Sequence, residues 1–127
     1  MNNHFDLISI GGGSGGIAGA NRAASHGAKC AVIEQAKLGG TCVNVGCVPK
    51  KVMWFAANMA ETFSISSDYG FDLNVNSFDW GILKNNRDTY IQRLNSIYEN
   101  NLNKNGVQHL RGTATFKDSH TIQVGDQ

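Results

Sequence analysis

Two cysteines separated by four residues, Cys42 and Cys47, are the side chains of this sequence with the clearest capacity for chemistry. Pro49 and Lys50 follow at once, and the apolar run 52–57 predicts a helix whose first turn accommodates the proline. Cys47 is therefore expected at a helix N-terminus, where the helix dipole and the lysine favour a thiolate. A cysteine pair in that setting predicts a redox centre.

Other interpretations of the pair are a structural disulfide and a metal site. A disulfide between Cys42 and Cys47 would close a very short loop and restrict the unfolded chain little. The first ten residues lack the basic start of a secretory signal, and disulfides kept for stability are uncommon in the cytoplasm. We therefore expect a cytoplasmic protein with a catalytic or sensing pair. No metal is predicted, because the other cysteine and the histidines have no zinc-like spacing (Cys30, His4, His26, His109 and His120).

A glycine-rich turn near the start of the sequence predicts a dinucleotide site. It follows an apolar run that predicts a buried strand, and it precedes a helical pattern and a second strand that ends at Glu34. In such a βαβ unit the three glycines permit a tight turn, the approach of a pyrophosphate and close helix–strand packing, and the acidic residue binds a ribose hydroxyl. These glycine roles fall in order on Gly11, Gly13 and Gly16, and the N–H of Gly15 joins the phosphate site. The pattern does not distinguish FAD from NAD, although a dithiol favours a flavin.

The order of these elements predicts an α/β protein with a Rossmann-like parallel sheet. Residues 77–105 are expected to form a helix with Ser77 as its N-cap. A strand over 107–116 is expected to turn back, and 121–127 to form the second arm of a β-hairpin near the C-terminus. The apolar stripe of the long helix predicts core packing, for Leu94 and Ile97 in particular.

The cysteine segment resembles a known active-site signature. Residues 39–51 contain two glycines, Cys, four residues, Cys, one residue and Pro, which is similar to the FAD-dependent pyridine nucleotide–disulfide oxidoreductases. Within that family, 43–54 resembles the glutathione reductases most, as do several later segments between 68 and 114. The resemblance implies reduction of glutathione disulfide by NADPH through FAD and a redox-active cysteine pair. Reductases of the trypanothione, mercuric or lipoamide type, and a non-catalytic FAD-binding remnant, stay open as alternatives.

The resemblance also implies roles for individual residues. Cys42 would attack the disulfide substrate, Cys47 would lie against the flavin, and Lys50 would sit near the reactive flavin nitrogen. Ser14 and Tyr98 would contact glutathione, although a tyrosine on a helix stripe more often packs in a core. The implied FAD contacts beyond the glycines and Glu34 are Ser14, Thr41, Cys42, Lys50 and Ala114.

The implied domain organisation is partial. Residues 1–127 would be the N-terminal part of an FAD-binding domain, and the NADPH and dimerisation domains of the family, with their catalytic histidine–glutamate pair, are absent. We expect a homodimer for full-length family members but not for these 127 residues, and no turnover by these residues alone. A net charge of +1 implies no nucleic-acid partner, and no apolar run is long enough to predict a membrane span.

Overall fold

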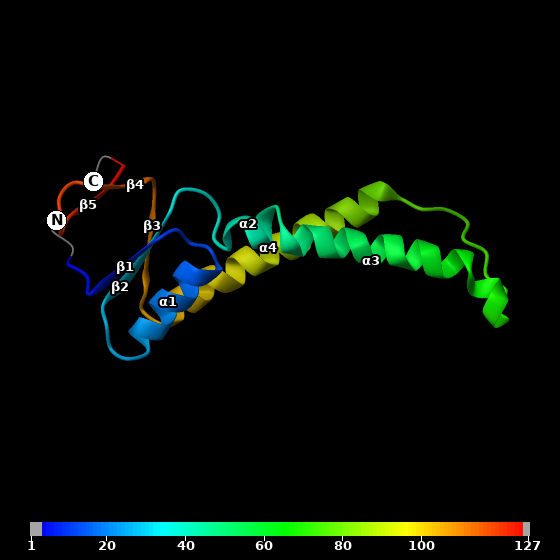
Figure 1. The fold of residues 1–127 in the computed structure, drawn as a ribbon, viewed down its shortest axis with the longest axis horizontal. Helices are drawn as coiled ribbons and strands as arrows, with labels where there is room; N and C mark the ends of the chain where they lie inside the picture. The colour runs from blue at the N-terminus through cyan, green and yellow to red at the C-terminus, as the bar shows by residue number, and fades with distance from the viewer. Residues whose placement is uncertain (1–3, 126–127) are drawn as a thin grey trace.

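The structure is a computed structural model that describes residues 4–125, and it has two regions (Figure 1). A sheet with one covering helix forms the region that we call the body. Two long antiparallel helices extend away from it, and their far ends, together with the segment that joins them, form the region that we call the arm (Figure 1). Both ends of the described part of the chain lie at the body (Figure 1). The molecule is elongated, and along the arm the two long helices lie side by side (Figure 1).

The body is a parallel three-stranded sheet in the order β1-β2-β3. Its strands are β1 (Leu7–Ile10), β2 (Cys30–Glu34) and β3 (Gln108–Arg111), and helix α1 (Ser14–Ala24) connects the first two. The register pairs Ile10 with Ile33 and Ile33 with Leu110. The central strand β2 is buried along four of its five residues, as expected for an apolar strand between two parallel neighbours. The predicted α/β class with a Rossmann-like parallel sheet is therefore confirmed.

The core of the body is small. Leu102, near the C-terminal end of the long helix α4 (Trp80–Lys104), is fully buried against α1 and β2. This contact fixes one end of α4 on the sheet. The buried residues of the cluster are Ile17, Ala20, Cys30, Val32, Leu38, Leu102 and Val107.

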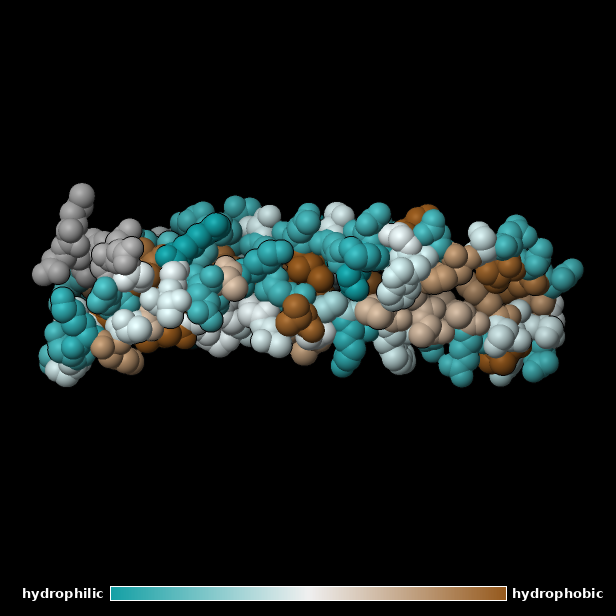
Figure 2. Space-filling model, turned by 90° about the horizontal axis from the view of Figure 1, so that it is seen from above, coloured by the Kyte–Doolittle hydropathy of each residue, from teal (hydrophilic) through white to brown (hydrophobic). Residues whose placement is uncertain are grey.

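The arm buries few of its apolar side chains. It contains most of α3 (Cys47–Ser64), the 3-10 helix η1 (Ser66–Tyr69) and the first turns of α4. No residue of α3 is buried, and Trp54 is 58% exposed. Figure 2 shows apolar side chains spread over the face of the arm that it presents. Among residues 4–125, no helix has both the length and the apolar character that a membrane crossing requires.

Two details of the long helix differ from the sequence-based expectation. Helix α4 begins at Trp80, and Asp79 is its N-cap, with Oδ1 accepting from the Ile82 N–H at 3.1 Å. The prediction of Ser77 as N-cap was therefore wrong, because aspartate and serine are similarly good caps and only one can precede the first turn. Ile97 is 39% exposed, so the prediction that it packs in a core is also wrong for the residues described. Leu94 is half-buried.

The expected strand over 107–116 is interrupted, whereas the expected hairpin is confirmed. β3 ends at Arg111, and β4 (Ala114–Phe116) pairs antiparallel with β5 (Ile122–Val124) in a separate sheet. The break is at Gly112, whose φ of +145° disfavours any other residue. A Cβ there would also lie 2.9 Å from Val124 Cγ1. Residues 126–127 of the predicted hairpin arm lie outside the described residues.

Candidate functional site

The glycine-rich turn joins β1 to α1 with the geometry that the fingerprint predicts. Gly11 has a φ of +105°, and its N–H donates to the Ile33 carbonyl at 2.8 Å. A Cβ on Gly16 would lie 2.0 Å from the Gly11 carbonyl oxygen, so only glycine allows the helix this close to the strand. The tight turn at Gly11 and the close packing at Gly16 are therefore confirmed. At Gly13 a Cβ would meet only the Gly40 Cα, at 3.9 Å, which leaves its outer side open.

The start of α1 has the features of an anion site. Gly13 is its N-cap and offers no side-chain hydrogen bond, and no acidic residue occupies the first turn. The N–H groups of Ser14, Gly15 and Gly16 lie in that turn, where an α-helix has no internal acceptors for them. Exposed N–H groups and the positive end of the helix dipole favour a phosphate here. Ser14 and Gly15 are exposed.

Glu34 is fixed by backbone donors at the end of β2. Its Oε2 accepts from the Gly12 N–H at 2.7 Å, and its Oε1 accepts from the Ala36 N–H at 2.8 Å. Each carboxylate oxygen keeps a further lone pair for a ligand hydroxyl. Gly12 was not assigned a role from sequence. A Cβ on it would lie 2.7 Å from Leu38 Cδ2, so this glycine also permits a close contact, and its place between two fingerprint glycines was the available signal.

The redox turn, which we define as residues 38–50, lies directly against the glycine-rich turn. The Gly39 N–H donates to the Gly12 carbonyl at 2.7 Å, and Gly13 and Gly39 form a parallel bridge. A Cβ on Gly40 would lie 2.9 Å from Gly13 Cα. Two motifs that the sequence separates by more than twenty residues therefore form one surface.

Three neighbouring clefts follow that surface. The first, of about 280 Å³, is lined by Gly11, Glu34 and Ala114. The second, of about 760 Å³, shares Glu34 with the first and includes Thr41. The third, of about 500 Å³, shares Asn44 and Val45 with the second and includes Lys50. Five of the residues with predicted cofactor roles thus line these three adjoining clefts: Gly11, Glu34, Thr41, Lys50 and Ala114.

The two cysteines are brought together at the junction of two helices. Cys42 lies in the short helix α2 (Gly40–Asn44), and Cys47 is the first residue of α3, as the sequence predicts. Gly46 makes the junction tight, since a Cβ on it would lie 2.8 Å from the Thr41 carbonyl oxygen. Both cysteines are free thiols here, with Cys42 half-buried and Cys47 exposed. The arrangement is that of a reduced dithiol.

The electrostatics of the pair act on Cys42. A hydrogen bond with the Cys47 side chain, followed by burial, raises the pKa of the Cys42 thiol, which outweighs the opposing effects of the Cys47 backbone N–H and the Lys50 ammonium. The Cys47 N–H at the helix terminus and the Lys50 ammonium thus act on the pKa of Cys42, where they favour the thiolate but are outweighed. By contrast, burial is the main cause that raises the pKa of the Cys30 thiol in the core. Cys30 is only 1% exposed, so reagents in solution do not reach this thiol.

Tyr98, a predicted substrate contact, lies on α4. Tyr98 is half-buried and packs against the core of the body, so its position in this structure is that of a packing residue. No group of three or more potential ligands for a metal ion occurs among residues 4–125.

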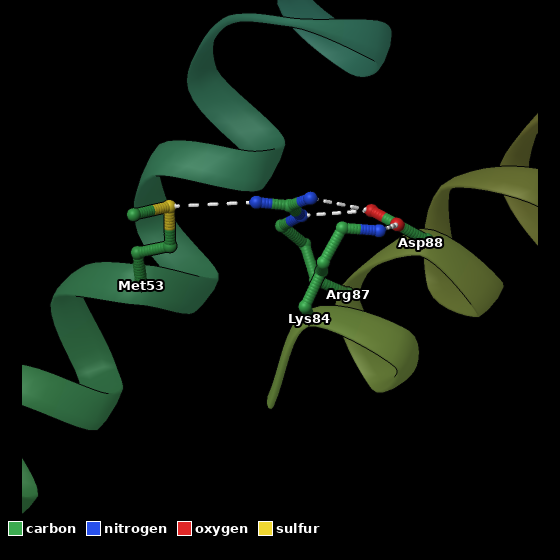
Figure 3. A network of polar contacts seen from close by, with 4 residues as sticks. All are labelled: Met53, Lys84, Arg87 and Asp88. Atoms are coloured by element: carbon green, nitrogen blue, oxygen red, sulfur yellow. Dashed lines mark hydrogen bonds and ion pairs between the residues drawn. The ribbon is translucent and has the colours of Figure 1, made fainter. Parts of the chain in front are cut away.

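An ion-pair network borders the third cleft, beside the redox turn. Asp88 accepts from Lys84 Nζ at 2.7 Å and from Arg87 Nη2 at 2.7 Å, and Arg87 Nη1 donates to Met53 Sδ at 3.7 Å (Figure 3). Lys84, followed by Arg87, lowers the pKa of the Asp88 carboxyl. Met53 belongs to α3 and the charged residues to α4, so the network links the two helices where they leave the body.

Asn44 and Asn95 form a second polar link that sequence reasoning missed. The Asn95 amide donates to Asn44 Oδ1 at 3.0 Å and to the Leu38 carbonyl at 2.7 Å. Both residues are half-buried. A hydrogen bond between amides 51 positions apart leaves no periodic signal in a sequence, so no pattern could have revealed it.

Comparisons with known proteins agree with this geometry. Residues 5–127 match the family described as pyridine nucleotide-disulphide oxidoreductase. The chain is 55% identical over 122 residues to a glutathione reductase of Schizosaccharomyces pombe, which covers 94% of this chain and 26% of that protein. It is 55% identical over 117 residues to a glutathione reductase of Yarrowia lipolytica, which covers 89% of this chain and 25% of that protein. The chain thus spans about a quarter of the length of these curated relatives. By fold, by the dithiol and by this match, the chain belongs to the pyridine nucleotide-disulphide oxidoreductase family.

Proposed function

We propose that this chain is the flavin-binding and dithiol-bearing part of an NADPH-dependent glutathione-disulfide reductase. The observation that carries the proposal is the direct contact between the glycine-rich turn and the redox turn, beside three adjoining clefts whose lining includes Gly11, Ala114 and Lys50. Adjoining clefts of that kind suit an extended dinucleotide that ends near a dithiol. The identity to two proteins named glutathione reductase supports glutathione disulfide as the substrate.

The residues present fit FAD. Gly16 and Gly12 admit no Cβ, Gly13 leaves room beside the helix terminus, and Glu34 is held by two backbone donors with lone pairs to spare. In the proposal Gly11, Gly13, Ser14, Gly15 and Gly16 hold the pyrophosphate, Glu34 binds the adenosine ribose and Ala114 borders the adenosine. Thr41, Cys42 and Lys50 line the flavin end. FAD, when bound, supplies the two-electron chemistry that returns the disulfide to the dithiol.

The chemistry proposed for the cysteines is thiol–disulfide exchange. The Cys42 thiolate attacks one sulfur of glutathione disulfide, and the first glutathione leaves as its thiolate. The Cys47 thiolate then attacks the Cys42 sulfur, the second glutathione leaves, and a Cys42–Cys47 disulfide remains. Lys50 favours the thiolate form of Cys42, because its positive charge lowers the pKa of that thiol. Ser14 and Tyr98 are proposed as glutathione contacts in the whole protein.

The setting proposed for this reaction is the cytoplasm, with no nucleic-acid or membrane partner and a homodimeric whole protein. Reducing conditions there keep thiols free, which suits a pair that must cycle. A partner subunit would cover part of the exposed apolar surface of the arm, which includes Trp54, Phe55 and Met59.

The test is an assay of NADPH consumption that depends on glutathione disulfide, made with the whole protein that contains these residues. Steady turnover is expected, and Cys42→Ser should abolish it, whereas Cys30→Ser should retain it. The 127-residue chain alone should show no turnover, because positioned groups for hydride delivery and proton transfer are not among its residues. Turnover with trypanothione disulfide, mercuric ions or lipoamide in place of glutathione disulfide would contradict the proposed substrate.

A further inference from the structure

The Asn95 side chain reaches from α4 to the redox turn. Its Nδ2 donates to the Leu38 carbonyl oxygen at 2.7 Å and to Asn44 Oδ1 at 3.0 Å. Since 57 positions separate Asn95 from Leu38, these are tertiary contacts rather than part of a local turn. They join a long helix to the segment that carries Cys42.

Asn44, which accepts from Asn95, also donates hydrogen bonds within the redox turn. Its Nδ2 donates to the Gly40 carbonyl at 2.9 Å and to the Leu38 carbonyl at 3.1 Å. The two amides fix one another's orientation, because rotating either by half a turn would set two donors or two acceptors face to face. Asn95, Asn44 and the Leu38 carbonyl therefore form one closed set of hydrogen bonds.

The redox turn needs such support. Helix α2 has only five residues, and its N-cap Gly39 supplies no side-chain hydrogen bond. A helix this short is marginal by itself, so tertiary contacts must hold it in place. Buried Val43 supplies the apolar contact, and Asn95 supplies the polar ones. The place of Cys42, between Val43 and Thr41, depends on both.

We propose that Asn95 is a positioning residue for the redox pair: through Asn44 and Leu38 it holds α2 so that the Cys42 thiol stays opposite Cys47. This inference rests on the proposed function, in which the two thiols close a disulfide. A closed disulfide restrains the turn with or without Asn95, whereas the dithiol is restrained only by non-covalent contacts. Asn95 thus lowers the entropy cost of closing the disulfide.

The experiment measures the thiol–disulfide equilibrium of the pair in dithiothreitol buffers of graded potential, on the whole protein that contains these 127 residues. As the Cys42–Cys47 bond forms, two electrons and two protons reduce the cyclic disulfide of dithiothreitol. Alkylation and mass spectrometry report the free thiols at each position. Asn95→Ala is expected to shift the equilibrium constant about tenfold against the disulfide, which makes the midpoint potential about 30 mV less negative.

The matched control is Asn105→Ala. Asn105 is the C-cap residue of α4, and its Nδ2 donates to Asn21 Oδ1 of α1 at 2.9 Å, so it makes a comparable amide–amide bond away from the redox turn. Its removal should leave the midpoint potential unchanged. Asn95→Ser, which keeps a small donor, should give an intermediate shift and serves if Asn95→Ala folds poorly.

The outcomes separate the two proposals. If Cys42 and Cys47 of the unaltered chain fail to close a disulfide, the proposed function is wrong, and this inference falls with it. If they close normally and Asn95→Ala has an unchanged midpoint, this inference alone is wrong. An equal shift in Asn105→Ala, or loss of helical circular dichroism in both Asn95 variants, also counts against it, because Asn95 would then serve the whole fold.

Discussion

The body and the arm differ in how far their apolar side chains are buried. In the body, four of five β2 residues are buried and Leu102 of α4 is fully covered. In the arm, α3 buries none of its residues and Trp54, Phe55 and Met59 are each more than half exposed. The apolar side chains of the body pack against one another, whereas those of the arm are exposed and of the kind that a contact with another protein covers. The redox turn lies where the two regions meet.

Helix α4 offers the largest expected effect, because it runs through both regions. Leu102→Ala should destabilise the chain by about 2–5 kcal/mol, since it opens a cavity in the core. Ile82→Ala, on the same helix, should change the unfolding free energy by less than about 0.5 kcal/mol, because Ile82 is 60% exposed. Urea unfolding followed by circular dichroism gives both values. Equal losses from the two variants would mean that the arm packs as the body does.

The glycine-rich turn gives a second, smaller test within the body. Gly16→Ala should destabilise by about 1–3 kcal/mol, because its Cβ would collide with the Gly11 carbonyl. Gly19→Ala, one turn later on the exposed side of α1, meets nothing within 4 Å and should stabilise the helix by about 0.5–1 kcal/mol. Thermal melting of both variants is the measurement. A tolerated Gly16→Ala would show that α1 and β1 are less closely packed than the structure has them.

The smallest effect is expected at the junction, in the reactivity of Cys42. Cys47→Ala removes the hydrogen bond that raises the pKa of the Cys42 thiol, while the backbone N–H at residue 47 and Lys50 still lower it. The pKa of Cys42 should therefore fall, and its alkylation by iodoacetamide near pH 7.5 should become a few-fold faster, since the thiolate is the nucleophile. The rate against pH, followed by mass spectrometry, locates that pKa. Buried Cys30 should stay unlabelled, and a slower reaction at Cys42 would reverse the assigned cause.

Local motifs of the body were predictable because each residue type answers one backbone requirement. Only glycine tolerates the φ of Gly11 and the close contact at Gly16. The spacing of these glycines therefore predicted the turn, the start of the helix and the strand that follows it. The place of Cys47 at the start of α3 followed in the same way from Pro49. A resemblance then added predicted roles for residues outside these motifs, such as Thr41 and Ala114.

The features that could not be predicted depend on partners distant in sequence or on exposure. The Asn95–Asn44 bond joins two common residues, and nothing in either neighbourhood marks the other. Ile97 has the spacing of a core residue but is 39% exposed, because periodicity shows which face of a helix is apolar and not what covers it. The N-cap of α4 was misplaced by two residues for a simpler reason, since Ser77 and Asp79 both have good capping side chains.

Helix α4 also has a mechanical consequence. It is an unbroken rod of 25 residues, anchored on the sheet at Leu102 and in contact with the redox turn at Asn95. At about 1.5 Å per residue, Asn95 lies about 10 Å from that pivot and Trp80 about 33 Å from it. A tilt of the helix about Leu102 that displaces Trp80 therefore displaces Asn95 about a third as far and in the same direction. Whatever clamps the tip of the arm thereby also steadies the carbonyl and amide groups around Cys42.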